Sequence, residues 1–151
     1  MTTIKSPIKV TVIRRFNNAP ERVFDAWLEP EMIAQWMFGP AVRDEEIVRL
    51  TAVARIGGSF SFLVRRNGEE IDHIGTYLEI RRPNRLVFTW GIGDAEGSRV
   101  TVEIVGHESG CELTLTHELD PDWVDYADRT KAAWEKMLEV LFIRLEKSSQ
   151  Q

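Results

Sequence analysis

The chain contains little cysteine: Cys111 is the only one among its 151 residues. A single thiol cannot close an intrachain disulfide, so buried apolar surface must hold the fold together. The first residues, Met-Thr-Thr-Ile-Lys, lack the apolar core of a signal peptide, and no apolar run approaches the ~18 residues of a membrane span. We therefore expect a protein of the reducing cytoplasm that has no integral association with a membrane.

Positive charge is also in deficit. Nineteen Lys and Arg residues face 24 Asp and Glu residues, which gives a formal net charge of −5 and a pI of about 5.3. This balance argues against the broad phosphate-binding surface that nucleic acid requires. The three histidines, His73, His107 and His117, have neither zinc-site spacing nor partnering cysteines, so we expect no metal and no other cofactor.

Motifs of covalent catalysis are missing as well. There is no G-x-S-x-G elbow, and Cys111 falls on the apolar phase of a predicted strand. A buried, unreactive thiol is therefore favoured over a nucleophile paired with His117. The glycine-rich run from Gly91 to Gly97 precedes a strand pattern and not a helix, so it predicts a hairpin turn and not a phosphate loop. We find no catalytic set in the sequence.

What the chain does contain is the composition of one globular domain over residues 1–151, with 43% hydrophobic and 28% charged residues. Apolar and polar residues alternate over residues 8–16 and in several stretches between Arg43 and His117, which predicts strands. Short turns such as Gly57-Gly58 separate these stretches. Connections this short join only antiparallel neighbours, because a parallel crossover needs about a dozen residues or more.

Two regions carry helical spacing instead. Residues 17–36 predict two short helices, the first entered through a capping residue before Pro20 and the second beginning where Pro30 interrupts the first. From Trp123 to Leu145, apolar residues recur every three or four positions, which predicts one long amphipathic helix. This order predicts an α+β fold: a curved antiparallel sheet of about six or seven strands that wraps the C-terminal helix and leaves a cavity between them.

Paired charges in the strand region are interpreted as surface features. Adjacent strand positions point to opposite faces, so neither Glu45-Glu46 nor Glu69-Glu70 can act on one substrate, and both pairs are expected in solvated turns. Arg65-Arg66 and Arg81-Arg82 could hold the anionic edge of a ligand, but they lie where strands end and are expected to be surface charge. Oligomeric state stays open, since an edge strand near Val100 could pair across a homodimer.

Other residues could face a cavity. His117 shares the apolar phase of Leu113, so it is either a hydrogen-bonded core histidine or a donor that orients a ligand. We place His73 and Tyr77 inward on one strand, with Gly75 leaving space between them. Aromatic residues could fill the core or line a pocket. The candidate cavity residues are Trp36, Phe60, Phe62, His73, Tyr77, Phe88, Trp90, His117, Trp134 and Met137.

Six motifs, in this order, carry a resemblance to a known family. They are Ala19-Pro20-Glu21-Arg22-Val23-Phe24-Asp25-Ala26-Trp27, Trp36 with Gly39-Pro40, Gly57-Gly58-Ser59-Phe60, Gly75-Thr76-Tyr77-Leu78-Glu79-Ile80, Leu86-Val87-Phe88-Thr89-Trp90 and Leu113-Thr114-Leu115-Thr116-His117. Over residues 8–146 the chain resembles the START-like (SRPBCC) helix-grip superfamily, in its branch similar to activators of the heat-shock protein 90 ATPase. One departure is Ala133-Trp134, where many relatives have Gly-Trp.

The resemblance implies a deep apolar cavity under the terminal helix, which the superfamily uses for lipids, sterols, polyketides and other hydrophobic molecules. It implies no shared catalytic set. Binding of a small hydrophobic molecule is therefore the first hypothesis. The second is a cyclase, dehydratase or hydrolase in which His73, Tyr77 or His117 moves protons in the same cavity. The third, implied by the family alone, is activation of a chaperone partner.

Overall fold

The computed structural model describes residues 7–93 and 98–149, and its strands form one antiparallel sheet. Along the sheet the order is β1-β7-β6-β5-β4-β3-β2, so the first strand pairs with the last and the others form a meander. The strands are β1 (Ile8–Phe16), β2 (Glu46–Ala52), β3 (Ser59–Arg66), β4 (Glu69–Arg81), β5 (Arg85–Ile92), β6 (Ser98–His107) and β7 (Gly110–Leu119). The predicted hairpin turn at 91–97 lies partly outside the described residues.

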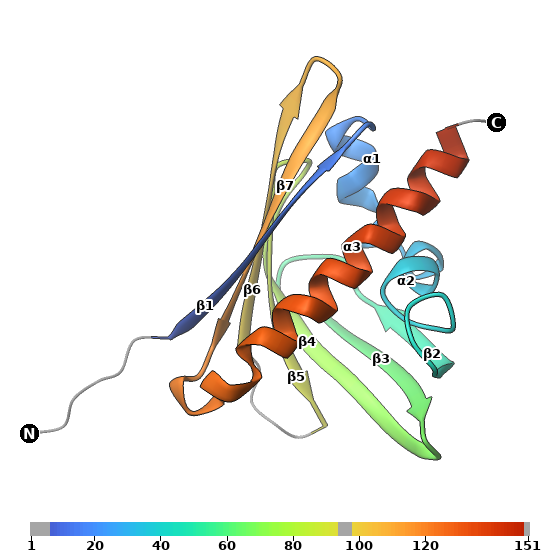
Figure 1. The fold of residues 1–151 in the computed structure, drawn as a ribbon, viewed down its shortest axis with the longest axis vertical. Helices are drawn as coiled ribbons and strands as arrows, with labels where there is room; N and C mark the ends of the chain where they lie inside the picture. The colour runs from blue at the N-terminus through green and yellow to red at the C-terminus, as the bar shows by residue number, and fades with distance from the viewer. Residues whose placement is uncertain (1–6, 94–97, 150–151) are drawn as a thin grey trace, which may run out of the picture.

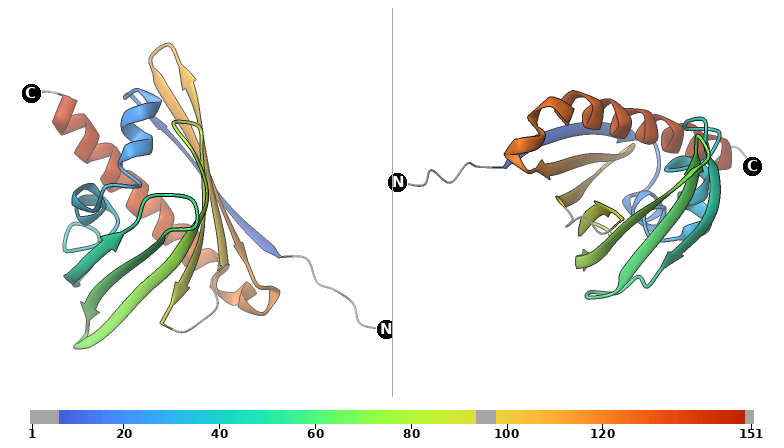
Figure 2. Two further views of the ribbon diagram at one scale, coloured as in Figure 1. Left: turned by 180° about the vertical axis from the view of Figure 1, so that it is seen from behind. Right: turned by 90° about the horizontal axis from the view of Figure 1, so that it is seen from below.

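Helices cover one side of this sheet. They are α1 (Pro20–Asp25), α2 (Pro30–Trp36), the 3-10 helix η1 (Pro121–Tyr126) and α3 (Ala127–Ser149). Figures 1 and 2 show that the sheet curves toward α3, which crosses its concave side, while α1 and α2 lie between α3 and the sheet at one end. The predicted α+β helix-grip architecture is thus confirmed. None of the described helices combines the length and the apolar character that crossing a membrane requires.

The cap predicted for the first helix and the start predicted for the terminal helix need correction. The N-cap of α1 is Ala19, which offers no side-chain hydrogen bond, although Pro20 and Glu21 occupy the first turn as predicted. The terminal helix begins only at Ala127, because Trp123 has non-helical dihedral angles (φ −100°, ψ 19°). Asp120 stabilises the preceding turn by accepting a hydrogen bond from the backbone N–H of Asp122 (2.9 Å). Trp123 therefore lies off the buried stripe of α3 and is 54% exposed.

The core lies between the sheet and the helices α1, α2 and α3. Trp36 is fully buried there, and its indole N–H donates to the carbonyl of Ala26 (3.0 Å). Phe60 packs directly over Gly75, where a Cβ atom would overlap the phenyl ring and the Thr89 carbonyl. The space predicted between His73 and Tyr77 is therefore filled by a neighbouring ring, a correction that only the cross-strand register reveals.

The interior position of β6 overturns the predicted dimer edge near Val100. This strand is hydrogen-bonded to β5 on one side and to β7 on the other, so it has no free edge. The strands at the two edges of the sheet are β1 and β2. Sequence periodicity identifies a strand but does not give its place in the sheet, which depends here on the pairing of β1 with β7.

Candidate ligand-binding cleft

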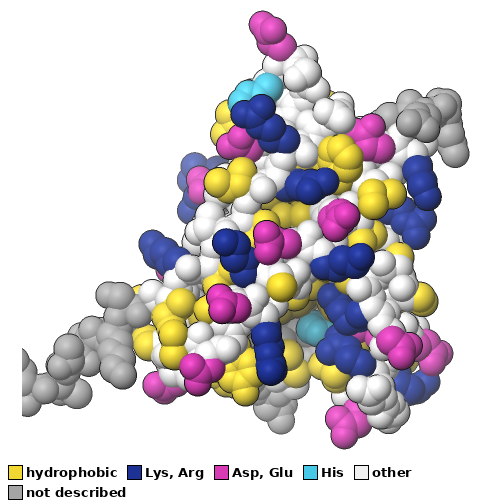
Figure 3. All heavy atoms as spheres, in the orientation of Figure 1, with side chains coloured by type: hydrophobic (Ala, Val, Ile, Leu, Met, Phe, Trp, Pro, Cys, Tyr) yellow, Lys and Arg dark blue, Asp and Glu magenta, His cyan; other side chains and the backbone are white. Residues whose placement is uncertain are grey.

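A cleft of about 820 Å³ opens between the sheet and the N-terminal half of α3. This volume is within the range of small-molecule sites. Its walls come from α3 (Thr130, Ala133, Trp134, Met137), η1 (Pro121, Trp123, Tyr126), the strand ends of β3 to β7 and the segment after α2. In Figure 3, hydrophobic side chains gather over η1 and the start of α3, and Lys and Arg side chains gather beside them.

Aromatic rings form the apolar walls. The ring of Trp90 lies 5.6 Å from that of Trp134 and 6.3 Å, nearly parallel, from that of Phe38 (centroid distances). Met137 lies on the adjoining turn of α3 and is 6% exposed. Flat rings with a flexible thioether beside them suit a planar or aliphatic molecule, because both kinds of surface pack without needing hydrogen bonds.

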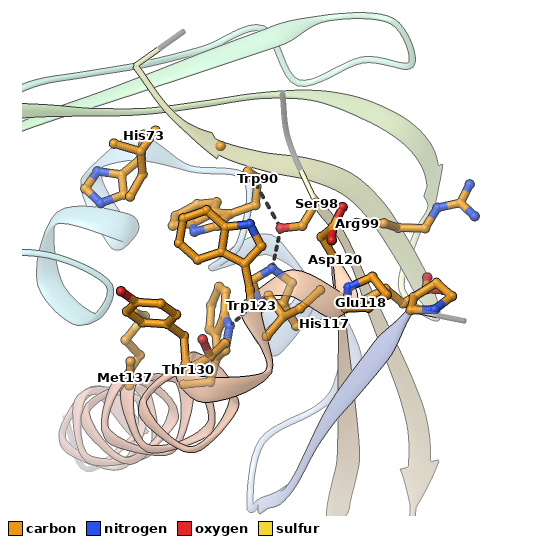
Figure 4. Close-up of a pocket in the computed structure, with 18 of the residues that line it drawn as sticks. His73, Trp90, Ser98, Arg99, His117, Glu118, Asp120, Trp123, Thr130 and Met137 are labelled. Atoms are coloured by element: carbon orange, nitrogen blue, oxygen red, sulfur yellow. Dashed lines mark hydrogen bonds between the residues drawn. The ribbon is translucent and has the colours of Figure 1, made fainter. Parts of the chain in front are cut away.

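A chain of hydrogen bonds ties these walls together (Figure 4). The indole N–H of Trp134 donates to Nδ1 of His117 (3.1 Å). Since Nδ1 accepts, the neutral imidazole carries its proton on Nε2 and donates to Oγ of Ser98 (2.6 Å). Ser98 in turn donates to the carbonyl of Trp90 (3.0 Å). Burial lowers the pKa of His117 to about 4, so the ring is neutral at pH 7.

His73 occupies the other side of the cleft. Its Nδ1 lies 3.1 Å from the carbonyl of Phe62, which only accepts, so Nδ1 carries the proton and Nε2 keeps a lone pair. The ring packs against Phe38 (4.7 Å) and Trp90 (5.4 Å). Burial, followed by the charge of Arg66, lowers the pKa of His73 and keeps it neutral. In Figure 4, His73, Trp90 and His117 face the same space, whereas Arg99 is directed away from it.

A buried carboxylate lies behind this side of the cleft. The side chain of Glu45 is fully buried and accepts from the backbone N–H of Gly39 (2.8 Å), from Arg43 (3.0 Å) and twice from Arg66 (3.1 and 2.7 Å). The predicted solvated position of Glu45 is therefore wrong, and so is the interpretation of Arg66 as surface charge. Glu45 precedes β2, so the alternation of a strand does not govern where its side chain points.

The structure divides the candidate residues into two groups. His73, Trp90, His117, Trp134 and Met137 line the cleft. The remaining candidates are buried in the core and are absent from the lining: Trp36, Phe60, Phe62, Tyr77 and Phe88. His73 and Tyr77 do both point inward, with 6% and 2% exposure, as predicted.

Sequence reasoning missed several residues that line the cleft. They include Phe38, Arg43, Arg66, Ser98, Trp123 and Tyr126. One signal was available: Trp123 and Tyr126 are large apolar residues three positions apart beside Asp120-Pro121, where a turn could present both to solvent. The ion pair between Glu45 and Arg66 joins residues 21 apart and leaves no local pattern.

Within residues 7–93 and 98–149, no group of His, Cys, Asp and Glu side chains is arranged to hold a metal ion. Cys111 lies outside the cleft lining, and burial raises the pKa of its thiol to about 11, as expected for an inert cysteine. His73 lines the cleft with a lone pair on Nε2.

Solved structures share this fold at low sequence identity. Protein CV1439 from Chromobacterium violaceum is 24% identical, with a TM-score of 0.76 over 91% of this chain and 96% of the other. Protein NE0264 from Nitrosomonas europaea is 17% identical, with a TM-score of 0.82 over 98% and 100% of the two chains. An AHSA1-like protein from Aeromonas hydrophila is 22% identical, with a TM-score of 0.78 over 95% and 96%.

Sequence comparison gives the assignment. No curated protein matches the chain. The family model described as "Activator of Hsp90 ATPase homolog 1-like protein" matches residues 17–146, which is most of the chain and spans the elements from α1 to α3. The chain therefore belongs to the Activator of Hsp90 ATPase homolog 1-like family, a branch of the SRPBCC helix-grip superfamily.

Proposed function

We propose that the protein binds a small hydrophobic molecule, planar or aliphatic, in the cleft between the sheet and α3. The observation that carries the proposal is the cleft of about 820 Å³, whose wall includes the contacting rings of Trp90 and Trp134. The indole N–H of Trp134 is already bonded to His117. The tryptophan wall therefore presents mainly apolar surface, which favours a ligand bound by its shape and apolar area.

The entrance of the cleft supports the same function. On η1, Trp123, Val124 and Tyr126 are 54%, 57% and 47% exposed, and the rings of Trp123 and Tyr126 lie 5.1 Å apart. Trp123 and Tyr126 also line the cleft. Contiguous apolar surface beside a cavity is typical of a ligand entrance, because it lets an apolar molecule leave water before it reaches the interior.

Titration of the purified protein with lipids, sterols and aromatic compounds, followed by tryptophan fluorescence and native mass spectrometry, tests the proposal. Ala133→Phe places a ring in the cleft and should abolish binding. Ala132→Phe is the matched control, since Ala132 is exposed on α3 and does not line the cleft. Failure of every compound to bind, or equal loss of binding in both variants, would contradict the proposal.

An enzymatic use of the cleft is the alternative, and His73 is the proton-transfer candidate that we favour for it. Both ring nitrogens of His117 are engaged within the protein. Tyr77 is absent from the cleft lining, and burial raises its pKa to about 12. His73 keeps a lone pair on Nε2, as a general base requires. Loss of turnover in His73→Gln, with ligand affinity retained, would favour the enzyme over the carrier.

The third candidate, activation of a chaperone ATPase, rests on the name of the family. No contact among the described residues adds to it, so it ranks below ligand binding. Stimulation of a chaperone ATPase by the purified protein would favour chaperone activation over ligand binding and over an enzymatic function.

A further inference from the structure

One side of the cleft carries an unusual balance of charge. Arg43 and Arg66 both line the cleft, and both are bonded to the same carboxylate, that of Glu45. Two guanidinium groups share one acid, and the neighbouring His73 is neutral. The cluster of these four residues therefore carries a net charge of +1, although the whole chain carries −5.

Both arginines have N–H groups that donate no hydrogen bond to the described residues. A guanidinium has five N–H groups. Arg43 uses its Nη1 on Glu45 and on the carbonyl of Met37 (3.2 Å), and Arg66 uses Nε and Nη2 on Glu45. No other acceptor among the described residues is bonded to either group. Glu45 itself accepts four hydrogen bonds, so it fixes the two arginines and has no capacity left for a ligand.

The neighbouring arginine shows how different this arrangement is. Arg65, one position away, contacts two carboxylates, Glu46 (3.3 Å) and Glu70 (3.2 Å), and does not line the cleft. Its charge is more than matched by those acids. Arg43 and Arg66 are also held more deeply, with side chains 23% and 33% exposed against 43% for Arg65. A half-buried cation with spare donors is poorly compensated and gains from a bound anion.

We propose that Arg43 and Arg66 form a carboxylate-binding subsite, so that the ligand is an amphipathic acid whose apolar body lies against Trp90 and Trp134. The inference rests on the proposed binding function and names its ligand class. A forked guanidinium matches the geometry of a carboxylate, and a charge-assisted hydrogen bond is roughly twice as strong as a neutral one. Phe38 links the two parts of the site: the guanidinium of Arg43 lies 5.8 Å from its ring centroid, and the ring of Trp90 lies 6.3 Å from the same ring.

Matched ligands separate this inference from the proposed function. The wild-type protein is titrated with 1-naphthaleneacetate and 1-naphthaleneethanol, and with decanoate and decanol, by calorimetry. We expect each acid to bind about tenfold or more tightly than its alcohol. If no member of either pair binds, the proposed function fails. If alcohols bind as tightly as acids, the function stands and the carboxylate subsite is overturned. Matched sulfonates and phosphates binding more tightly than the carboxylates would also overturn the assigned headgroup.

Variants then locate the subsite. Arg43→Gln and Arg66→Gln should each bring the affinity for the acid down roughly tenfold, toward that of the alcohol, without changing alcohol affinity. Arg65→Gln is the matched control and should leave both affinities unchanged. Unchanged acid affinity in both of the first two variants would overturn the proposal.

Removing one arginine leaves the buried carboxylate of Glu45 with fewer partners, and such a variant could fail to fold. A measurement on the wild-type protein therefore tests the subsite without any substitution. Raising the salt concentration from about 0.01 M to about 1 M should weaken binding of the acid but not of the alcohol, because salt screens the attraction between exposed or half-exposed charges. Acid binding that does not respond to salt, together with an acid-to-alcohol ratio near one, would overturn the subsite.

Discussion

The concave side of the sheet is closed at one end and open at the other, although both ends are rich in aromatic residues. At the closed end α1 and α2 pack against the sheet, and Trp27 and Trp36 meet edge to face at 4.7 Å. At the open end η1, the start of α3 and the segment after α2 line the cleft opposite the strand ends, and the contacting rings of Trp90 and Trp134 form part of its wall. The covering helices, and not the composition of the sheet, therefore decide where this protein keeps space for a ligand.

The two ends also differ in buried polarity. Of the four buried polar or charged residues within the described chain, Glu45, His73 and His117 lie at the open end. Burying a polar or charged group costs free energy unless its hydrogen bonds are satisfied, so such groups are rare in protein cores. Their concentration beside the cleft supports the proposed binding site at this end.

Truncating one residue at each end gives the largest expected contrast. Phe60→Ala should lower the free energy of unfolding by about 4 kcal/mol, because Phe60 is enclosed by Gly75, Phe62 and Tyr77 and a cavity would remain. Met137→Ala should cost only about 2 kcal/mol, since its side chain borders open space. Urea unfolding of both variants measures the difference. Equal costs would mean that the open end is as tightly packed as the core.

Acid should destabilise the protein through the open end. An unfolded imidazole titrates near pH 6.5, whereas burial lowers the pKa of His117 to about 4 in the folded state. Between these values the unfolded chain binds more protons, so the free energy of unfolding is highest above about pH 6.5 and falls, by up to about 3 kcal/mol from this residue, as the pH drops to about 4.

Urea unfolding from pH 7 to pH 4 measures this slope, and His117→Gln should flatten it. His73 adds to the slope in the same direction, because burial also lowers its pKa, so the difference between wild type and variant isolates His117. His107→Gln, on the exposed β6–β7 hairpin, is the matched control. An unchanged slope in His117→Gln would show that the imidazole is not buried as described.

A smaller effect is expected at the turn that leads into the open end. Asp120→Ala removes the hydrogen bond to the backbone N–H of Asp122 and should cost about 1 kcal/mol of stability. Because η1 lines the cleft, the same variant should also weaken ligand binding. Asp125→Ala, on an exposed position of η1, controls for the loss of charge. Thermal unfolding and ligand titration of the two variants give the comparison.

The smallest effect concerns the closed end and involves no change in stability. Cys111 is 1% exposed, and burial raises the pKa of its thiol to about 11. We expect it to react with thiol reagents at pH 8 at least about tenfold more slowly than free cysteine, and at full rate in urea. Ligand should leave the rate unchanged. Rapid labelling of the folded protein would show that this end is not closed.

The architecture was largely predictable, because strands and helices leave local patterns. The alternation of Val100 and Val102 with polar residues predicted β6, and the short turns predicted antiparallel pairing. The place of β6 inside the sheet was not predictable, since it depends on β1 pairing with β7 far along the chain. The start of α3 was misplaced because Trp123 fits the helical spacing but lies in a kinked turn.

The site was predictable only where its residues share a strand or helix phase. His117 and Trp134 were found because each lies on the apolar side of its own element. Glu45 was missed because its burial depends on Arg43 and Arg66 arriving from a loop and from the end of β3. Charges that compensate one another across the fold have no signature in a single stretch of sequence.

The pairing of β1 with β7 also bears on how the molecule is made. Ile8 lies opposite Leu119, and Phe16 lies opposite Cys111, so the first strand can pair only after the last strand has been made. Bringing such distant segments together costs more chain entropy than closing the hairpins of the meander. We expect the hairpins from β2 to β6 to form early. Molecules that have not finished folding should therefore accumulate with β1 still unpaired. During synthesis, residues 8–16 would remain an exposed, half-apolar strand until their partner leaves the ribosome.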